Sequence, residues 1–185
     1  MLGEIGIGNT TVAAALTGGL LDAAPAEVVG LGSGADTAML ERKREVVRDA
    51  LHRVRDTDRK NPLAVLAALG GPEFAVLAGV VLGASSVGAV VVLDGLATSI
   101  AALIATRLEP AAAANLVAGQ RSRELGHRLA LVELGCEPLL DLRIRAGEGV
   151  GACLAAGLLR QAMAVRTATA RTVGPPPESS PSTRG

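Results

Sequence analysis

Apolar and polar positions alternate along this chain in blocks that predict helices separated by short strands. The apolar run from Val12 predicts a helix over 12–21, and the amphipathic pattern after Ala38 predicts another over 38–55. Further helices are predicted over 63–69, 72–82, 97–108, 128–134 and 152–164, and strands over 27–31, 90–93 and 116–118. Strands that alternate with helices are typical of parallel sheets. We therefore predict an α/β fold, a parallel sheet flanked by helices in a Rossmann-like three-layer arrangement.

The uncharged stretch from Phe74 to Leu93 is long enough to cross a bilayer. Gly83 to Gly88 interrupts it, however, and the β-branched run after this interruption is typical of a buried strand. A helix, a turn and a strand is the more economical interpretation, and a small membrane protein is the alternative. The start carries Glu4 and no basic region, so no signal peptide is evident. We expect no membrane partner and a cytoplasmic localisation.

The composition narrows the classes of partner. The 185 residues carry 18 basic and 18 acidic side chains and a single aromatic residue, Phe74, which argues against a nucleic-acid partner. Cys136 and Cys153 lack metal-site spacing, so we expect two buried, reduced thiols and no metal. One domain is expected over 1–172, followed by a disordered Pro/Ser-rich tail over 173–185.

The first candidate for chemistry is the segment GEIGIGNTT, Gly3 to Thr11. Gly6 and Gly8 permit positive φ and close approach of a ligand to the backbone. Asn9, Thr10 and Thr11 could cap the helix that comes next, and a helix N-terminus behind a glycine turn suits a phosphate. The segment is neither a P-loop nor a GxGxxG fingerprint. A strand-to-helix turn without a ligand is the simpler alternative.

Other polar residues fall where predicted strands end and helices begin, which is where α/β sheets bind ligands. They are Glu4, the loop 32–36, Asp94, the loop 122–127 and Glu148. Singly, each has a simpler explanation: Asp94-Gly95 as a strand-end turn, His127 as a surface or capping residue, and Lys43 as one charge on a solvated helix face. Together they predict one crevice.

Six motifs in order give the chain a resemblance to a known family. They are GEIGIGNTT; GSG at 32–34 followed by Lys43; NPLAVLAALGGPEFAVLAGVVLGA; VVVLDGLATSIAALIA; SRELGH; and LDLRIRAGEGVGACLA. From residue 3 to about residue 160, the chain resembles the C-terminal half of nicotinate-nucleotide:dimethylbenzimidazole phosphoribosyltransferases. The family makes the lower-ligand nucleotide of cobalamin.

The resemblance implies transfer of phosphoribose from nicotinate mononucleotide to 5,6-dimethylbenzimidazole, giving α-ribazole 5′-phosphate and nicotinate with inversion at the anomeric carbon. The matched Glu148 would be the general base, and we expect it to be partly buried between its glycines. The matched Glu4 would be a second catalytic carboxylate, which orients the nucleophile or stabilises charge on the ribose.

The resemblance also implies the substrate-binding residues. Lys43 would neutralise the phosphate while backbone N–H groups cradle it. The full set is Gly6, Gly8, Asn9, Thr10, Lys43, Asp94, Gly95, Ser122 and Gly147. Neither a metal nor a cofactor is implied, the partners are the two small-molecule substrates, and a homodimer is expected.

The chain also departs from the family pattern. It lacks a counterpart of the family's N-terminal half, which normally supplies much of the benzimidazole pocket, so a fragment or a mis-called start is one interpretation. Leu31, Gln120 and Ala146 stand where the family usually has Arg, His and Leu. The alternative function is a truncated nucleotide-binding fragment without catalysis, and the base that is accepted stays open.

Overall fold

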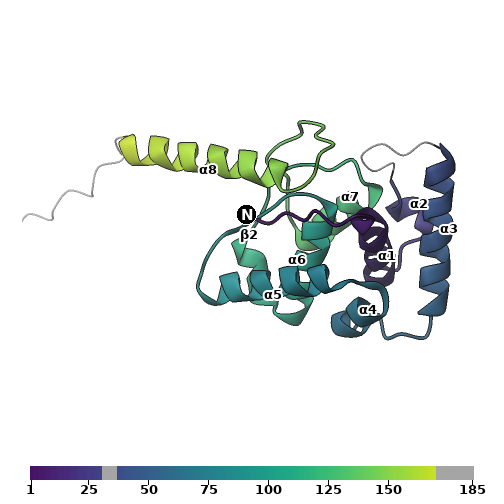
Figure 1. The fold of residues 1–185 in the computed structure, drawn as a ribbon. Coiled ribbons are helices and arrows are strands. Elements are labelled where there is room, and N and C mark those ends of the chain that lie inside the picture. The colour runs from purple at the N-terminus through teal and green to yellow at the C-terminus, as the bar shows by residue number, and fades with distance from the viewer. Residues whose placement is uncertain (31–36, 170–185) are drawn as a thin grey trace, which may run out of the picture.

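The structure is a computed structural model that describes residues 1–30 and 37–169. The predicted loop at 32–36 and the predicted tail at 173–185 therefore lie outside the described residues. Strands β1 and β2 and the helices succeed one another along the chain as in Figure 1. Their bounds are α1 Asn9–Leu21, α2 Pro25–Val28, α3 Thr37–Arg53, α4 Pro62–Leu69, α5 Pro72–Ser86, β1 Val91–Leu93, α6 Leu96–Leu108, η1 Pro110–Asn115, β2 Leu116–Ala118, α7 Leu125–Leu134 and α8 Val150–Ala168.

A short parallel sheet lies at the centre of the fold. Strand β1 pairs with β2 in parallel, with Val92 opposite Val117. Two further segments extend it: the Leu2 N–H donates to the Val92 carbonyl at 2.9 Å, and the Leu140 N–H donates to the Gly119 carbonyl at 3.1 Å. Four stretches of chain thus lie side by side, and the loops that leave them emerge near the same edge of the sheet.

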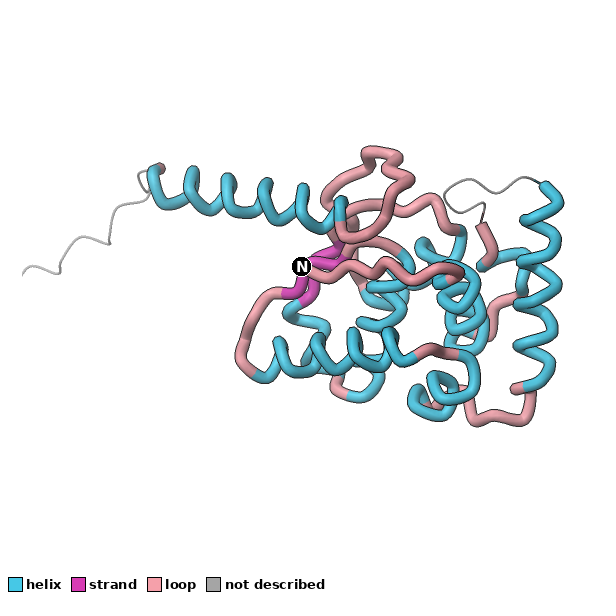
Figure 2. The backbone as a smooth tube through the Cα atoms, viewed as in Figure 1, coloured by secondary structure: helices cyan, strands magenta, loops and turns pink. Residues whose placement is uncertain are grey.

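Helices cover both faces of this sheet, which confirms the predicted three-layer α/β fold. Val91 and Leu93 belong to the large core built with α1, α5 and α6, where Phe74 is fully buried. Val92 points the other way and packs against Ala152 and Ala155 of α8. Successive strand residues serve opposite layers because side chains alternate across a strand. Figure 2 shows the two strands between α8 and the other helices.

The stretch from Phe74 to Leu93 forms part of this interior. Helix α5 ends at Ser86, a turn comes next with Gly88 at φ 69°, and β1 begins at Val91. The predicted helix, turn and strand are confirmed, although the helix continues four residues past 82 because the turn begins only at Val87. Among the described residues, no helix is long and apolar enough to cross a membrane.

The strand predicted over 27–31 is wrong in its described part. Residues 25–28 form the short helix α2, with Pro25 at its first position. The Glu27 carboxylate accepts a hydrogen bond from the Ala24 N–H at 2.8 Å, and the Val29 N–H donates to the Pro25 carbonyl at 3.0 Å. Proline at the first turn and a carboxylate that caps it favour a helix, and these local signals outweigh the β-branched pair Val28-Val29.

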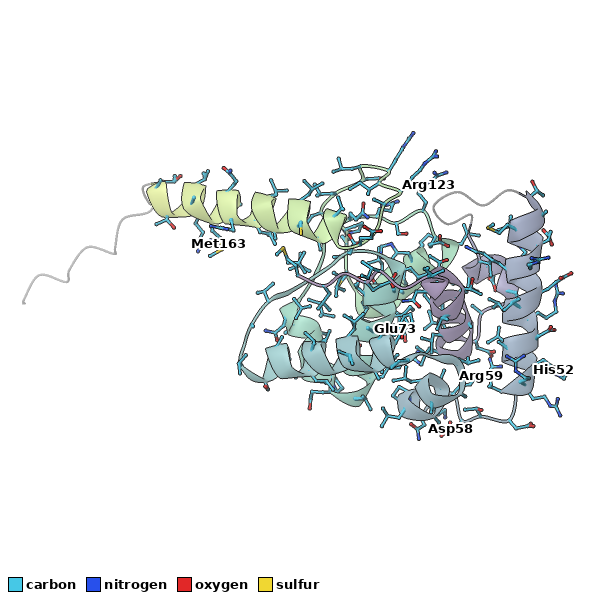
Figure 3. The ribbon with its side chains drawn as sticks, in the orientation of Figure 1. His52, Asp58, Arg59, Glu73, Arg123 and Met163 are labelled. Atoms are coloured by element: carbon cyan, nitrogen blue, oxygen red, sulfur yellow. The ribbon has the colours of Figure 1, made fainter. Side chains whose placement is uncertain are left out.

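Helix α8 packs through its first turns only. Gly151, Ala152 and Ala155 are buried, whereas every residue from 160 to 168 is exposed. The helix projects from the rest of the fold (Figure 1), and Met163, 69% exposed, points into solvent (Figure 3). The far half of α8 thus offers an apolar surface that no described residue covers.

Candidate active site

A cavity of about 400 Å³ opens at the edge where the four central segments end. Its walls come from residues 4–10, 94–98, 120, 122–124 and 144–148. Each wall segment comes shortly after one of the paired stretches, which explains how residues distant in sequence meet. The cavity contains the sequence-predicted residues Glu4, Gly6, Gly8, Asn9, Thr10, Asp94, Gly95, Ser122, Gly147 and Glu148 in its lining. Lys43 does not line it.

The first wall is a turn organised by Glu4. Its carboxylate accepts hydrogen bonds from the Gly6 N–H at 2.9 Å and from the amide of the buried Asn9. A Cβ on Gly6 would lie 2.2 Å from Asn9 Nδ2, so any side chain at this position would displace the Asn9 amide from Glu4. Gly8, at φ 85°, is the N-cap of α1, and the prediction that Asn9, Thr10 or Thr11 supplies a side-chain cap is wrong. Asn9 instead braces Glu4 across the turn.

The start of α1 leaves backbone donors open at the cavity. The N–H groups of Gly8 and Thr10 have no acceptor among the described residues. The Lys43 ammonium on α3, half-buried, donates to Thr10 Oγ1 at 3.1 Å. A helix N-terminus with open N–H groups and a nearby cation favours an anion. Lys43 thus contacts a residue of the cavity lining, Thr10, without lining the cavity itself. That Lys43 binds the phosphate stays a prediction.

The second turn carries Glu148. Gly147, Glu148 and Gly149 all have positive φ, at 66°, 59° and 86°. For a residue with a side chain this conformation costs on the order of 1 kcal/mol, and such residues concentrate at functional sites. Glu148 is exposed, so the expected partial burial is wrong. The conformation leaves the carboxylate at the surface of the cavity.

The two turns touch through their backbones. A Cβ on Gly3 would lie 2.7 Å from the Gly149 Cα and 3.0 Å from the Glu148 carbonyl carbon. Only glycine allows this approach, and it places the residues next to Gly3 and Gly149, namely Glu4 and Glu148, on adjoining walls of one cavity. The sequence separates these carboxylates by most of the chain, and the fold brings them together.

Asp94 explains how the second turn is held. Its buried carboxylate accepts hydrogen bonds from the Gly149 N–H at 3.2 Å and the Ala152 N–H at 3.1 Å, and so caps α8. The backbone N–H groups of Asp94 and Gly95 donate to Thr98 Oγ1 at 2.9 and 3.1 Å. Asp94 is therefore more than a strand-end turn residue, because its hydrogen bonds to the start of α8 hold the turn that carries Glu148.

The loop after β2 is held by His127, which the sequence analysis interpreted as a surface or capping residue. That interpretation is wrong, because His127 is 1% exposed. The Ser122 N–H donates to His127 Nδ1 at 2.9 Å, so the ring proton lies on Nε2, which faces Ser99 Oγ at 3.1 Å. Burial, followed by the charge of Arg121, lowers the pKa of His127 to about 4. The imidazole is therefore neutral at pH 7.

Sequence reasoning missed several cavity residues. Ile5 and Ile7, both strongly exposed, offer apolar contacts beside the first turn. Gln120 is 3% exposed, and its Oε1 has no hydrogen-bond partner among the described residues. Arg123 and Arg145 also line the cavity. Ile5 and Ile7 alternate with glycines in the segment GEIGIGNTT, and this pattern could have indicated that their side chains are exposed.

The two cysteines differ from the expectation of buried thiols. Both are free, but Cys136 is only half-buried and Cys153 is exposed. Burial raises the pKa of the Cys136 thiol. Neither cysteine lines the cavity.

Comparison with known proteins agrees with this geometry. A phosphoribosyltransferase family model matches residues 1–173. The chain is 48% identical over 165 residues to a nicotinate-nucleotide:dimethylbenzimidazole phosphoribosyltransferase of Salinispora tropica, and 46% identical over 168 residues to one of Mycobacterium tuberculosis. The chain belongs to this family. In structure it is similar to CobT from Thermus thermophilus, with a TM-score of 0.81 and 47% identity over 86% of this chain.

The match to these family members is partial. It covers 89% of this chain but 45% of the Salinispora protein, and 91% of this chain but 46% of the Mycobacterium protein. The same holds for the Thermus crystal structure, of which 47% is covered. The chain thus spans about half the length of the curated relatives that it matches.

Proposed function

We propose that the cavity binds nicotinate mononucleotide and 5,6-dimethylbenzimidazole and that the chain carries the catalytic residues for phosphoribosyl transfer between them, in cobalamin nucleotide synthesis. The observation that supports this most is the backbone contact between the Gly3 and Gly149 turns. It sets two carboxylates at a cavity into which a helix N-terminus opens. Membership in the family supports the same chemistry.

In the proposed reaction, one ring nitrogen of dimethylbenzimidazole attacks the anomeric carbon of the ribose. The bond from that carbon to the nicotinate ring nitrogen breaks, and its electron pair remains on the nicotinate. Glu148 takes the proton from the other benzimidazole nitrogen as the attack proceeds. Its exposed carboxylate, between two glycines without side chains, is accessible to a flat heterocycle.

Glu4 has a different part in this proposal. Both of its hydrogen-bond donors, Gly6 and Asn9, belong to its own turn, so it shapes the wall that receives the nucleotide. The negative charge of its carboxylate also stabilises the positive charge that develops on the ribose as the nicotinate departs. The phosphate binds at the open N–H groups of Gly8 and Thr10, next to the Lys43 ammonium. Asn9, Gly95, Ser122 and Gly147 complete the walls.

The second candidate function is nucleotide binding without catalysis. The partial coverage of the relatives favours it, because residues from the uncovered half could belong to the benzimidazole pocket. The two candidates share the nucleotide site and differ only in turnover.

A turnover assay separates them. The purified chain is incubated with nicotinate mononucleotide and dimethylbenzimidazole, and free nicotinate and α-ribazole phosphate are monitored by chromatography. We expect product with the wild type and with Glu137→Gln, a control on an exposed carboxylate outside the cavity, but at least about 100-fold less with Glu148→Gln. Nucleotide binding without product would favour the second candidate, and full turnover by Glu148→Gln would refute the assigned base.

We also propose a homodimer in the cytoplasm. Leu154 and Leu158, each 49% exposed, continue the apolar surface of α8, and a second copy would remove it from water. Light scattering at the monomer mass over a range of concentrations would contradict the dimer.

A further inference from the structure

Acidic residues outnumber basic residues in the described lining of the cavity. Its described lining holds the acidic residues Glu4, Asp94, Glu124 and Glu148, and its basic residues are Arg123 and Arg145. Nicotinate mononucleotide brings a phosphate and, on its ring, a carboxylate. The ring nitrogen that bears the ribose is a pyridinium cation, which acidic residues favour, but the carboxylate on the same ring is repelled by them unless cations compensate.

Arg123 and Arg145 are available for that purpose. Both are exposed, and neither guanidinium forms an ion pair or a hydrogen bond with another described residue. Arg121, one residue from the cavity wall, differs because it lies 3.7 Å from the Asp141 carboxylate and does not line the cavity. Figure 3 shows Arg123 among the loops at the upper edge of the fold.

On the basis of the proposed function, we infer that Arg123 and Arg145 bind the ring carboxylate of nicotinate mononucleotide and so select the nicotinate nucleotide over its nicotinamide counterpart, in which a neutral carboxamide replaces the carboxylate. A guanidinium presents paired N–H donors that match the two oxygens of a carboxylate. A binding site that provides such donors disfavours an analogue without the carboxylate, because the guanidinium donors then lose their charged acceptor.

The position of these arginines favours the carboxylate over the phosphate. The phosphate site proposed above uses the turn that begins α1, together with Lys43. Arg123 and Arg145 come from two other walls, the loop after β2 and the loop that precedes α8. Arg145 lies in the same loop as Glu148, so it places a positive charge on the wall that carries the proposed base.

The test compares two ligands on the whole chain. Nicotinate mononucleotide and nicotinamide mononucleotide are titrated calorimetrically into the wild type, Arg123→Gln, Arg145→Gln and the control Arg121→Gln. We expect the wild type to prefer the nicotinate nucleotide. Arg123→Gln and Arg145→Gln should each raise the Kd of nicotinate mononucleotide about fivefold or more. The Kd of nicotinamide mononucleotide should change by less than about twofold. Arg121→Gln should bind both as the wild type does, and Lys43→Gln should weaken both equally.

The remaining outcomes each count against a defined claim. Equal weakening of both nucleotides by the cavity variants would place the guanidiniums on the phosphate and overturn the inference, with the nucleotide site intact. Unchanged binding of both would overturn it as well. A wild type that binds neither nucleotide would overturn the inference together with the proposed function. Far-UV circular dichroism checks that the variants fold, which we expect because both side chains are exposed.

Discussion

The buried His127 should make the stability of this fold depend on pH between about 6.5 and 4. Its Nδ1 accepts the Ser122 N–H and its Nε2–H faces Ser99, so a second proton would break the bond to Ser122 and put a charge in the interior. The pKa of an ordinary histidine is 6.5, whereas that of His127 in the fold is about 4. The unfolded chain therefore binds the proton more readily.

The sign and size of the effect are set by that difference. Because the folded pKa is the lower one, the stabilisation is fully present above pH 6.5 and is lost as the pH falls toward 4. The full difference corresponds to about 3 kcal/mol, and linkage gives a loss of about 2 kcal/mol between pH 7.5 and pH 5.0. That is a large share of the 5–15 kcal/mol typical of a domain.

Urea unfolding monitored by circular dichroism at 222 nm measures this loss, since the chain has no Trp or Tyr for fluorescence. We expect the free energy of unfolding of His127→Gln to fall between pH 7.5 and 5.0 by about 2 kcal/mol less than that of the wild type. The exposed His52 provides the matched control, and His52→Gln should behave as the wild type does. Equal pH dependence of His127→Gln and wild type would refute the reasoning.

Three further predictions concern stability and are read from the same unfolding experiment. Leu16→Ala, at a fully buried position of the core, should cost about 2–5 kcal/mol, and a cost below about 1 kcal/mol would contradict the packing described. Asp94→Asn should cost about 1–3 kcal/mol, because an amide cannot accept both the Gly149 and Ala152 N–H groups; an unchanged midpoint would count against this cap. Gly3→Ala should lower the free energy of unfolding because its Cβ meets the Gly149 backbone, and Gly3→Val should lower it further because its side chain is larger. Unchanged stability of both variants would argue against the contact between the turns.

The sequence predicted the sheet and the long helices because their signals are local. The β-branched run before Asp94 and the apolar spacing after Leu96 specify β1 and α6 almost to the residue. The prediction failed at 27–28, where Pro25 and the Glu27 cap decide for a helix. A four-residue helix carries too little periodicity to compete with two adjacent valines.

The candidate site divides in the same way. Strand-end positions predicted that Glu4, Asp94 and Glu148 would meet, since parallel segments end at one edge. Their partners could not be predicted from spacing, because they depend on contacts between distant segments. The exposure of Glu148, the burial of His127 and the Asp94 cap on α8 are of this kind. The roles of the residues in binding and catalysis stay predictions.

An amide NMR titration of the ¹⁵N-labelled chain with nicotinate mononucleotide tests most directly whether this cavity is a nucleotide site. We predict that the saturable shifts concentrate on Gly8 and Thr10 at the start of α1, on Gly95 and Ser122, and on Gly147 and its neighbours. The far half of α8 should not respond. Shifts confined to another surface, or none at millimolar nucleotide, would contradict the central claim.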